Sequence, residues 1–217
     1  MKKALALSLM CFMVLNITLH AQEEDDYYQE GQGEYDWYGD LPSLYSAGDK
    51  TFNISPGITI PALFINKDPS KFDDKKVLSY PEHNFNRTGG AGALAFNYFI
   101  NSNVFLGGEI GGQFIGTLAK NTSYIIPIGF RSGYQFLVWR LEIPLTMVIG
   151  IAPQTLLNYG YAGLFIKGGP AVFYRFNPDW SFGVDLNWAW FPQWTSQPKK
   201  NAHGNFIQIF LSARYHF

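Results

Sequence analysis

The last twelve residues, from Phe206 to Phe217, alternate between apolar and polar side chains up to the final position. A period of two predicts a β-strand with one apolar face. Chain termini usually fray, so an aromatic terminus on an unbroken apolar face suits a strand that closes a sheet. The apolar face consists of Ile207, Ile209, Leu211, Ala213, Tyr215 and Phe217, and the other face of Gln208, Ser212, Arg214 and His216, with Phe206 and Phe210 as its apolar exceptions.

The same alternation occurs seven more times between Thr51 and Trp190. An even number of strands, with short turns at one end and longer loops at the other, is typical of outer-membrane barrels. The sequence therefore predicts an all-β fold, a closed antiparallel eight-stranded transmembrane β-barrel in up-and-down meander order. The predicted strands are 51–60, 89–100, 104–117, 124–136, 139–151, 163–174, 180–190 and 206–217, with tight turns at 101–103, 137–138 and 177–179 and longer connections at 65–87, 152–160 and 195–204, beside a short one at 119–122.

Large apolar side chains share one face of every predicted strand, and small or charged side chains share the other. The interior of an eight-stranded barrel is only wide enough for side chains, so the large residues would overfill it. They are therefore predicted to face lipid. The charged residues are predicted to face inward, because an arginine at mid-membrane costs about 2–4 kcal/mol. Aromatic residues gather near the strand ends, as expected for two interfacial girdles.

Five prolines fall within the predicted strands. Proline has no N–H to donate to a ladder and is normally found at sheet edges or bulges. A closed barrel has no edge, so the sequence predicts local bulges at these positions. The five are Pro56, Pro61, Pro127, Pro144 and Pro170.

The N-terminus has the pattern of a cleaved signal peptide over residues 1–21. Lys2 and Lys3 precede an apolar run, and Ala21 supplies a small residue before the predicted cleavage point. The alternative is a single spanning helix, but the run of about 16 residues is shorter than the roughly 20 that a bilayer requires. Cys11 is the only cysteine and lies in this run, so the mature chain is predicted to contain no thiol.

Residues 22–49 differ in composition from the rest of the chain, and the barrel domain is predicted to occupy 50–217. The segment holds nine of the 17 acidic residues, interleaved with tyrosine and tryptophan and without any period. This composition predicts a mostly disordered, acidic and aromatic N-terminal extension. It is either a tether that binds a partner or a solvated leader before the first strand.

From Thr51 to Phe217 the chain resembles the small eight-stranded outer-membrane proteins of Gram-negative-type bacteria, namely the OmpA barrel domain, OmpX and OmpW. The terminal Tyr215-His216-Phe217 resembles the assembly signal that the barrel assembly machinery recognises, and Tyr215 and Phe217 are its predicted assembly residues. The stretches 126–129 (IPIG) and 142–145 (EIPL) are similar to OmpW-like barrels of spirochaetes and Bacteroidetes. The resemblance implies the bacterial outer membrane, with both barrel termini in the periplasm. It implies little about activity.

The predicted inward face carries charges of both signs on different strands. One interpretation is a salt-bridged plug that satisfies buried charges and closes the barrel. The other is a polar pathway or gate through the barrel. The predicted interior charge network is Glu109, Arg131, Arg140, Glu142, Lys167, Asp185 and Arg214.

Four functions are compatible with this pattern. The first two are a narrow or closed porin-like barrel for small molecules, hydrophobic ones included, and a protein of membrane integrity. The apolar exceptions on the inward face either line a pocket or fill gaps at the ends; they are Phe99, Phe105, Ile115, Val148, Phe165 and Phe173. The third is adhesion or interaction through the outer loops, chiefly the charged loop 65–87. The fourth is an enzyme of the outer rim using Ser79, Glu82, His83 or His203, and these residues form no recognisable motif, so no enzymatic activity is predicted.

The predicted partners are outer-membrane lipid and the barrel assembly machinery, with small hydrophobic solutes or extracellular ligands as further candidates. The formal charge of −1 and the lack of a basic cluster argue against nucleic acid, and a monomer is expected. The four histidines are scattered and have no cysteine partners, so no metal site is predicted. The glycine pairs occur in strands rather than before helices, so no phosphate loop and no cofactor are predicted.

Overall fold

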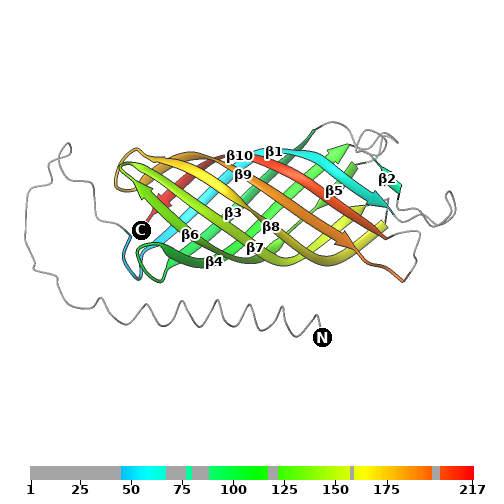
Figure 1. Ribbon diagram of the computed structural model, residues 1–217, viewed down its shortest axis with the longest axis horizontal. Helices are drawn as coiled ribbons and strands as arrows, with labels where there is room; N and C mark the ends of the chain where they lie inside the picture. Colours follow the sequence, from blue (N-terminus) through cyan, green and yellow to red (C-terminus); the bar gives the residue numbers. More distant parts are fainter. Residues whose placement is uncertain (1–44, 67–76, 80–87, 117–121, 157–158, 197–200) are drawn as a thin grey trace, which may run out of the picture. The chain divides into compact units, whose positions relative to one another are not determined.

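The computed structural model describes residues 45–66, 77–79, 88–116, 122–156, 159–196 and 201–217. Within these ranges, no helix is long and apolar enough to cross a membrane. The ordered elements are ten antiparallel strands (Figure 1). They are β1 (Lys50–Asn66), β2 (Val77–Ser79), β3 (Gly89–Phe99), β4 (Val104–Gly116), β5 (Thr122–Ile125), β6 (Ile128–Val138), β7 (Leu141–Leu156), β8 (Tyr159–Arg175), β9 (Trp180–Gln193) and β10 (Ala202–His216).

The sheet closes on itself because β10 pairs with β1, from Thr51 opposite His216 to Asn66 opposite Ala202. In Figure 1 the cyan β1 and the red β10 lie side by side. Strands β5 and β6 both pair with β4 and β7, so together they occupy one strand position in the barrel wall. Each such strand position is called a stave below. Within the described part of the chain, the short β2 pairs with the end of β1 alone. The barrel therefore has eight staves in meander order, which confirms the predicted fold class.

The two ends of the barrel have different connections. The turn end carries the short links 100–103, 139–140 and 176–179, together with the C-terminus. The opposite end is called the loop end here. The tight turn predicted at 137–138 is wrong, because β6 continues to Val138 and the turn is Trp139–Arg140. The connection predicted at 152–160 is also mostly wrong, because β7 reaches Leu156 and β8 starts at Tyr159.

Two of the five in-strand prolines disrupt the ladder as predicted. The β1–β10 register shifts between Pro61 and Leu63. Pro127 lies between β5 and β6 and splits that stave. The backbone there is still paired, since Ile126 donates to the carbonyl of Pro153 at 2.9 Å.

The bulges predicted at Pro56, Pro144 and Pro170 are wrong. Pro56 lies opposite Gly92 in an unshifted β1–β3 register, and Pro144 lies opposite Gln135 in an unshifted β6–β7 register. Pro170 is opposite Leu145, again without a shift. Each strand of a closed barrel has two neighbours, and a missing N–H removes a bond to only one of them. The other ladder therefore holds the register.

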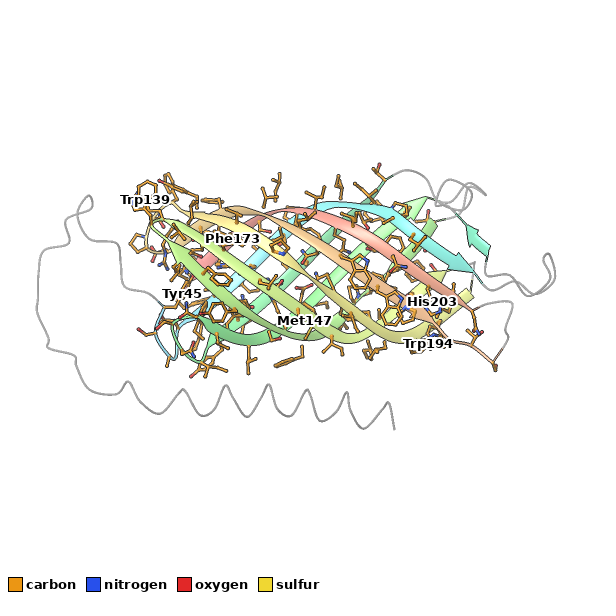
Figure 2. All side chains as sticks on the ribbon, viewed as in Figure 1. Tyr45, Trp139, Met147, Phe173, Trp194 and His203 are labelled. Atoms are coloured by element: carbon orange, nitrogen blue, oxygen red, sulfur yellow. The ribbon has the colours of Figure 1, made fainter. Side chains whose placement is uncertain are left out.

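The two faces of the strands have the polarity predicted for a barrel in lipid. In the centre of β7, Met147 is 53% exposed whereas its neighbours Thr146 and Val148 point inward at 6% and 0%. Figure 2 shows Met147 about half-way along the barrel and Trp139 at the turn end. Other large apolar side chains on the outer face include Ile54, Leu94, Phe96, Ile110, Phe130, Leu145, Ile151, Leu164, Val184, Leu186, Trp188, Ile207 and Leu211.

Candidate functional site

The centre of the barrel contains one carboxylate that is paired with two cations. Glu109 of β4 accepts a hydrogen bond from Arg131 Nη1 of β6 at 2.5 Å. The second carboxylate oxygen of Glu109 forms an ion pair with Lys167 Nζ of β8. All three side chains are buried. Strand alternation puts each of them on the inward face, and the two ion pairs join three staves across the lumen.

A second carboxylate lies nearer the turn end. Glu142 of β7 accepts from Arg214 Nη1 of β10 at 2.8 Å and from the Ser181 hydroxyl of β9 at 3.0 Å. Arg175 Nε of β8 is 3.4 Å from the same carboxylate. The guanidinium of Arg214 also lies 3.9 Å from the ring centroid of Phe173, a distance suited to a cation–π contact. Glu142 therefore joins four staves.

The remaining two members of the predicted network lie elsewhere. Asp185 is buried and accepts a hydrogen bond from the Ser212 hydroxyl, which is itself 2.7 Å from the Ser55 hydroxyl. Arg140 was expected to point inward from a strand, but it lies half-buried in the Trp139–Arg140 turn, with its guanidinium 5.9 Å from the Trp139 ring centroid. The difference follows from the two-residue extension of β6.

Tyr45 is a site residue that sequence reasoning missed. It precedes β1, yet its side chain is 3% exposed because it enters the turn end of the barrel. Its hydroxyl donates to Glu142 Oε2 at 2.8 Å and is 3.1 Å from His216 Nδ1. Burial raises the pKa of the Tyr45 hydroxyl to about 12, so the group stays protonated and keeps donating. The only sequence signal was one tyrosine among many in an aperiodic segment.

Apolar side chains fill the barrel interior towards the loop end. Phe165 stacks on Phe191 with centroids 5.7 Å apart, and Phe206 meets Phe191 edge-on at 5.8 Å. Glycines make room for such rings: a Cβ on Gly129 would lie 2.9 Å from the Phe165 ring. The buried cluster consists of Ile115, Ile125, Val148, Ala152, Phe165, Ala189, Phe191, Ala202 and Phe206.

A smaller apolar cluster occupies the turn end, where Tyr45, Phe99 and Phe105 are buried together with Leu137 against them. The apolar exceptions on the inward face therefore pack against one another. Phe173 lies against Arg214 instead. The described interior thus holds an apolar cluster towards each end, together with the ion pairs of Glu109 and Glu142.

Several buried polar atoms lack a hydrogen-bond partner in the described protein. Asn53 has neither its amide oxygen nor its amide nitrogen paired, and Arg214 has Nε and Nη2 unpaired. Buried groups of this kind ordinarily bind ordered water. The barrel interior around Asn53 and Arg214 therefore suits a few internal waters.

The outer-rim residues considered for catalysis are described only in part. Glu82 and His83 lie outside the described residues, and the Ser79 side chain is likewise undescribed. His203 stacks on Trp190 at 5.9 Å instead. Ser181 is 2.8 Å from His216 Nε2, but it is fully buried and held by Glu142. Among the described residues, no group of three or more His, Cys, Asp or Glu side chains could hold a metal ion.

The predicted assembly residues lie at the turn end of β10. Tyr215 is half-buried and contacts Trp180, with centroids 5.0 Å apart. Phe217 is exposed, and its backbone N–H donates to the Lys50 carbonyl at 3.0 Å. Phe217 therefore adds a final bond to the seam between β10 and β1.

A closed barrel with an apolar outer belt and ion pairs inside defines a transmembrane β-barrel of the outer-membrane class. The chain belongs to the protein family whose profile matches residues 34–215, a span that includes the barrel from β1 almost to its end.

Two uncharacterized proteins of Treponema pallidum (strain Nichols) are similar in sequence. One is 30% identical over 129 residues, which is 59% of this chain and 59% of the relative. The other is 23% identical over 188 residues, which is 79% of this chain and 65% of the relative. The chain therefore spans less than two thirds of the length of either relative.

Among solved structures, the outer membrane protein OprG from Pseudomonas aeruginosa is similar with a TM-score of 0.53 at 9% identity, covering 80% of this chain and 97% of OprG. This likeness shows a shared fold. Neisserial surface protein A is similar with a TM-score of 0.48 at 9% identity, covering 79% of this chain and 98% of that protein.

Proposed function

We propose that this protein is an integral protein of the bacterial outer membrane whose barrel is closed at rest and contributes to membrane integrity, with both barrel termini in the periplasm. The observation that carries the proposal is the double pairing of Glu109 with Arg131 and Lys167 across the lumen. The apolar packing of Phe165, Phe191 and Phe206 beyond it supports the same state. The short turns lie at the end that carries the C-terminus, as in barrels whose turns are periplasmic.

Replacing Arg131 with Ala tests closure. Glu109 keeps Lys167, so the loss of one buried charged hydrogen bond is expected to lower the unfolding free energy by about 1.5–3 kcal/mol. Because the apolar cluster is untouched, planar-bilayer recordings of the refolded variant should show no added conductance. Arg140→Ala, in the turn, is the matched control and should change stability by about 1 kcal/mol or less. A stable Arg131→Ala variant with raised conductance would favour the gate interpretation instead.

Assembly by the barrel assembly machinery is part of the proposal, supported by the exposed aromatic Phe217 at the end of β10. Deleting Phe217 should reduce the fraction of protein that reaches the folded, membrane-inserted form in cells, because the last seam bond and the terminal aromatic ring are both lost. Replacing Val138, an exposed residue at the same end, with Ala is the control. Normal insertion of the deletion variant would contradict this role.

A second candidate function is the passage of small apolar molecules, and the seam between β8 and β9 favours it. Towards the loop end, the regular β8–β9 pairing stops at Ile166 opposite Trp190. By contrast, β7–β8 pairing continues to Leu156–Tyr159, and β9–β10 pairing to Gln193–Ala202. The next residue on β9 after Phe191 is Pro192, which has no N–H to donate. Phe165 of β8 and Phe191 of β9 belong to this stretch, and both side chains are buried in the barrel.

Binding of a fluorescent fatty acid to the refolded barrel tests this candidate. Saturable binding is expected, and a cysteine pair at Leu164 and Pro192 should reduce it when oxidised, because the disulfide would close the seam. The reduced double variant is the control. Unsaturable partitioning, the same as into protein-free micelles, would rule the seam out.

The adhesion alternative rests on the loop 65–87, most of which lies outside the described residues. It stays a prediction, and a pull-down of host or matrix proteins by the intact barrel and by a loop-deleted variant would test it.

A further inference from the structure

The segment that leads into β1 forms a hook at the turn end. Tyr45 is buried while its neighbours Ser46 and Ala47 are exposed, so among the described residues before β1 it is the Tyr45 side chain that enters the barrel. Gly48 donates to the Phe99 carbonyl at 2.9 Å, and Phe99 donates to the Asp49 carbonyl at 2.8 Å. Gly48 has a φ of 101°, which glycine adopts readily and other residues do not. These bonds fix the point where the chain turns towards the mouth.

The walls around Tyr45 match the chemistry of a phenol ring. Phe99 stacks face to face on it, with centroids 3.9 Å apart and planes inclined by 6°. The Arg175 guanidinium lies 5.1 Å from the ring centroid, within the range of a cation–π contact. At the far end of the ring, the hydroxyl donates to Glu142 Oε2 and lies 3.1 Å from His216 Nδ1. An apolar face, a cation and a charged acceptor thus meet one flat ring with one hydroxyl.

The walls come from the barrel itself. Phe99 belongs to β3, Glu142 to β7, Arg175 to β8 and His216 to β10, and each is paired with a residue of a neighbouring strand. Glu142 also keeps Arg214 and Ser181 as partners when Tyr45 is disregarded. The pocket is therefore built by residues whose positions do not depend on the ring that fills it.

We propose that the turn end of the barrel is a binding site for a single phenol ring, and that Tyr45 occupies it as a tethered, exchangeable plug. Tethering makes the binding intramolecular, with an effective concentration of about millimolar or more. Free phenols therefore compete poorly against Tyr45 in the intact chain. When the hook is withdrawn, the site accepts a para-substituted phenol or a tyrosine side chain of another peptide.

The test uses p-cresol, which is the tyrosine side chain without its backbone, and the Tyr45→Ala variant of the refolded protein. At ten times its dissociation constant, p-cresol should raise the melting temperature of the variant by about 3–6 °C. At the same p-cresol concentration, the melting temperature of the wild-type protein should rise by less than about 1 °C. Toluene, which lacks the hydroxyl, should bind the variant at least about tenfold more weakly, because Glu142 loses its donor.

Tyr134→Ala is the matched control, because Tyr134 is an exposed tyrosine near the same end of the barrel, and p-cresol should not stabilise this variant more than the wild type. If Tyr45→Ala does not refold alone, adding p-cresol during refolding should restore the yield. A Tyr45→Ala protein that p-cresol neither stabilises nor rescues would overturn the proposal, as would equal stabilisation of the variant and the wild type. Either result leaves the closed barrel of the proposed function intact, since Glu109 and the loop-end apolar cluster with Phe165, Phe191 and Phe206 do not include Tyr45.

Discussion

Replacing Glu142 with Ala is expected to lower the free energy of unfolding by about 3–5 kcal/mol, because the change leaves a buried cation without its counter-charge. Arg214 is 1% exposed and lies 2.8 Å from the carboxylate. Tyr45 and Ser181 lose their acceptor at the same time. Urea unfolding of the refolded protein in lipid vesicles, followed by tryptophan fluorescence, measures the loss.

Two variants separate charge from shape in this prediction. Glu142→Gln keeps an acceptor for Tyr45 and Ser181 but removes the charge, so it should lie between the wild type and Glu142→Ala. Asp179→Ala removes an exposed acid from a turn at the same end and should change stability by about 0.5 kcal/mol or less. Similar losses for Asp179→Ala and Glu142→Ala would mean that the Glu142 network does not hold the barrel.

The second large effect concerns the outer face. Met147 is 53% exposed in the centre of β7, where the outer face of the barrel is expected to contact lipid. Replacing it with Arg is expected to cost about 2–4 kcal/mol, because the guanidinium must be buried in the hydrocarbon or reach out of it. The measurement is the free energy of unfolding from vesicles.

Val138→Arg is the depth control for that change. Val138 is 58% exposed, about as much as Met147, but it ends β6 beside the turn. The cost there should fall to about 0–1 kcal/mol, since the side chain reaches the interface. Equal costs at the two positions would argue that the belt does not lie across a bilayer.

The fold was predictable because period-2 alternation is a local signal and each strand repeats it. In β10 the alternation of Leu211, Ser212 and Ala213 indicates which side chains face lipid and which face the lumen. A register slip of one residue would move every side chain to the opposite face. The inward position of Glu109, Arg131 and Lys167 followed from the same rule. Their pairing did not, because it depends on how the eight staves are staggered around the barrel.

The features that the sequence did not predict arise at the ends of strands, where alternation stops being informative. Arg140 lies in a turn rather than in a strand, and the first residue of that turn, Trp139, adopts a φ of 56°. No local sequence pattern predicted this conformation. Tyr45 contacts Glu142 and His216, which are 97 and 171 residues away in the chain. An aperiodic segment carries no signal for such long-range contacts. Pro144 and Pro170 cause no register shift, so a closed barrel tolerates the loss of a backbone N–H donor at these positions.

The most direct test of a lipid-facing belt is a nitroxide scan along β10, from Ile207 to Tyr215, in lipid vesicles. Single cysteines can be introduced without a competing thiol, because Cys11 is the only native cysteine and lies in the predicted signal peptide. Collision with dissolved oxygen is expected to peak at 207, 209, 211, 213 and 215 and to fall at the residues between them. Collision with a water-soluble nickel complex should stay low at the outward positions in mid-strand. High nickel accessibility at Ile209 and Leu211, or oxygen peaks at Gln208, Phe210 and Ser212 instead, would contradict a lipid-facing belt.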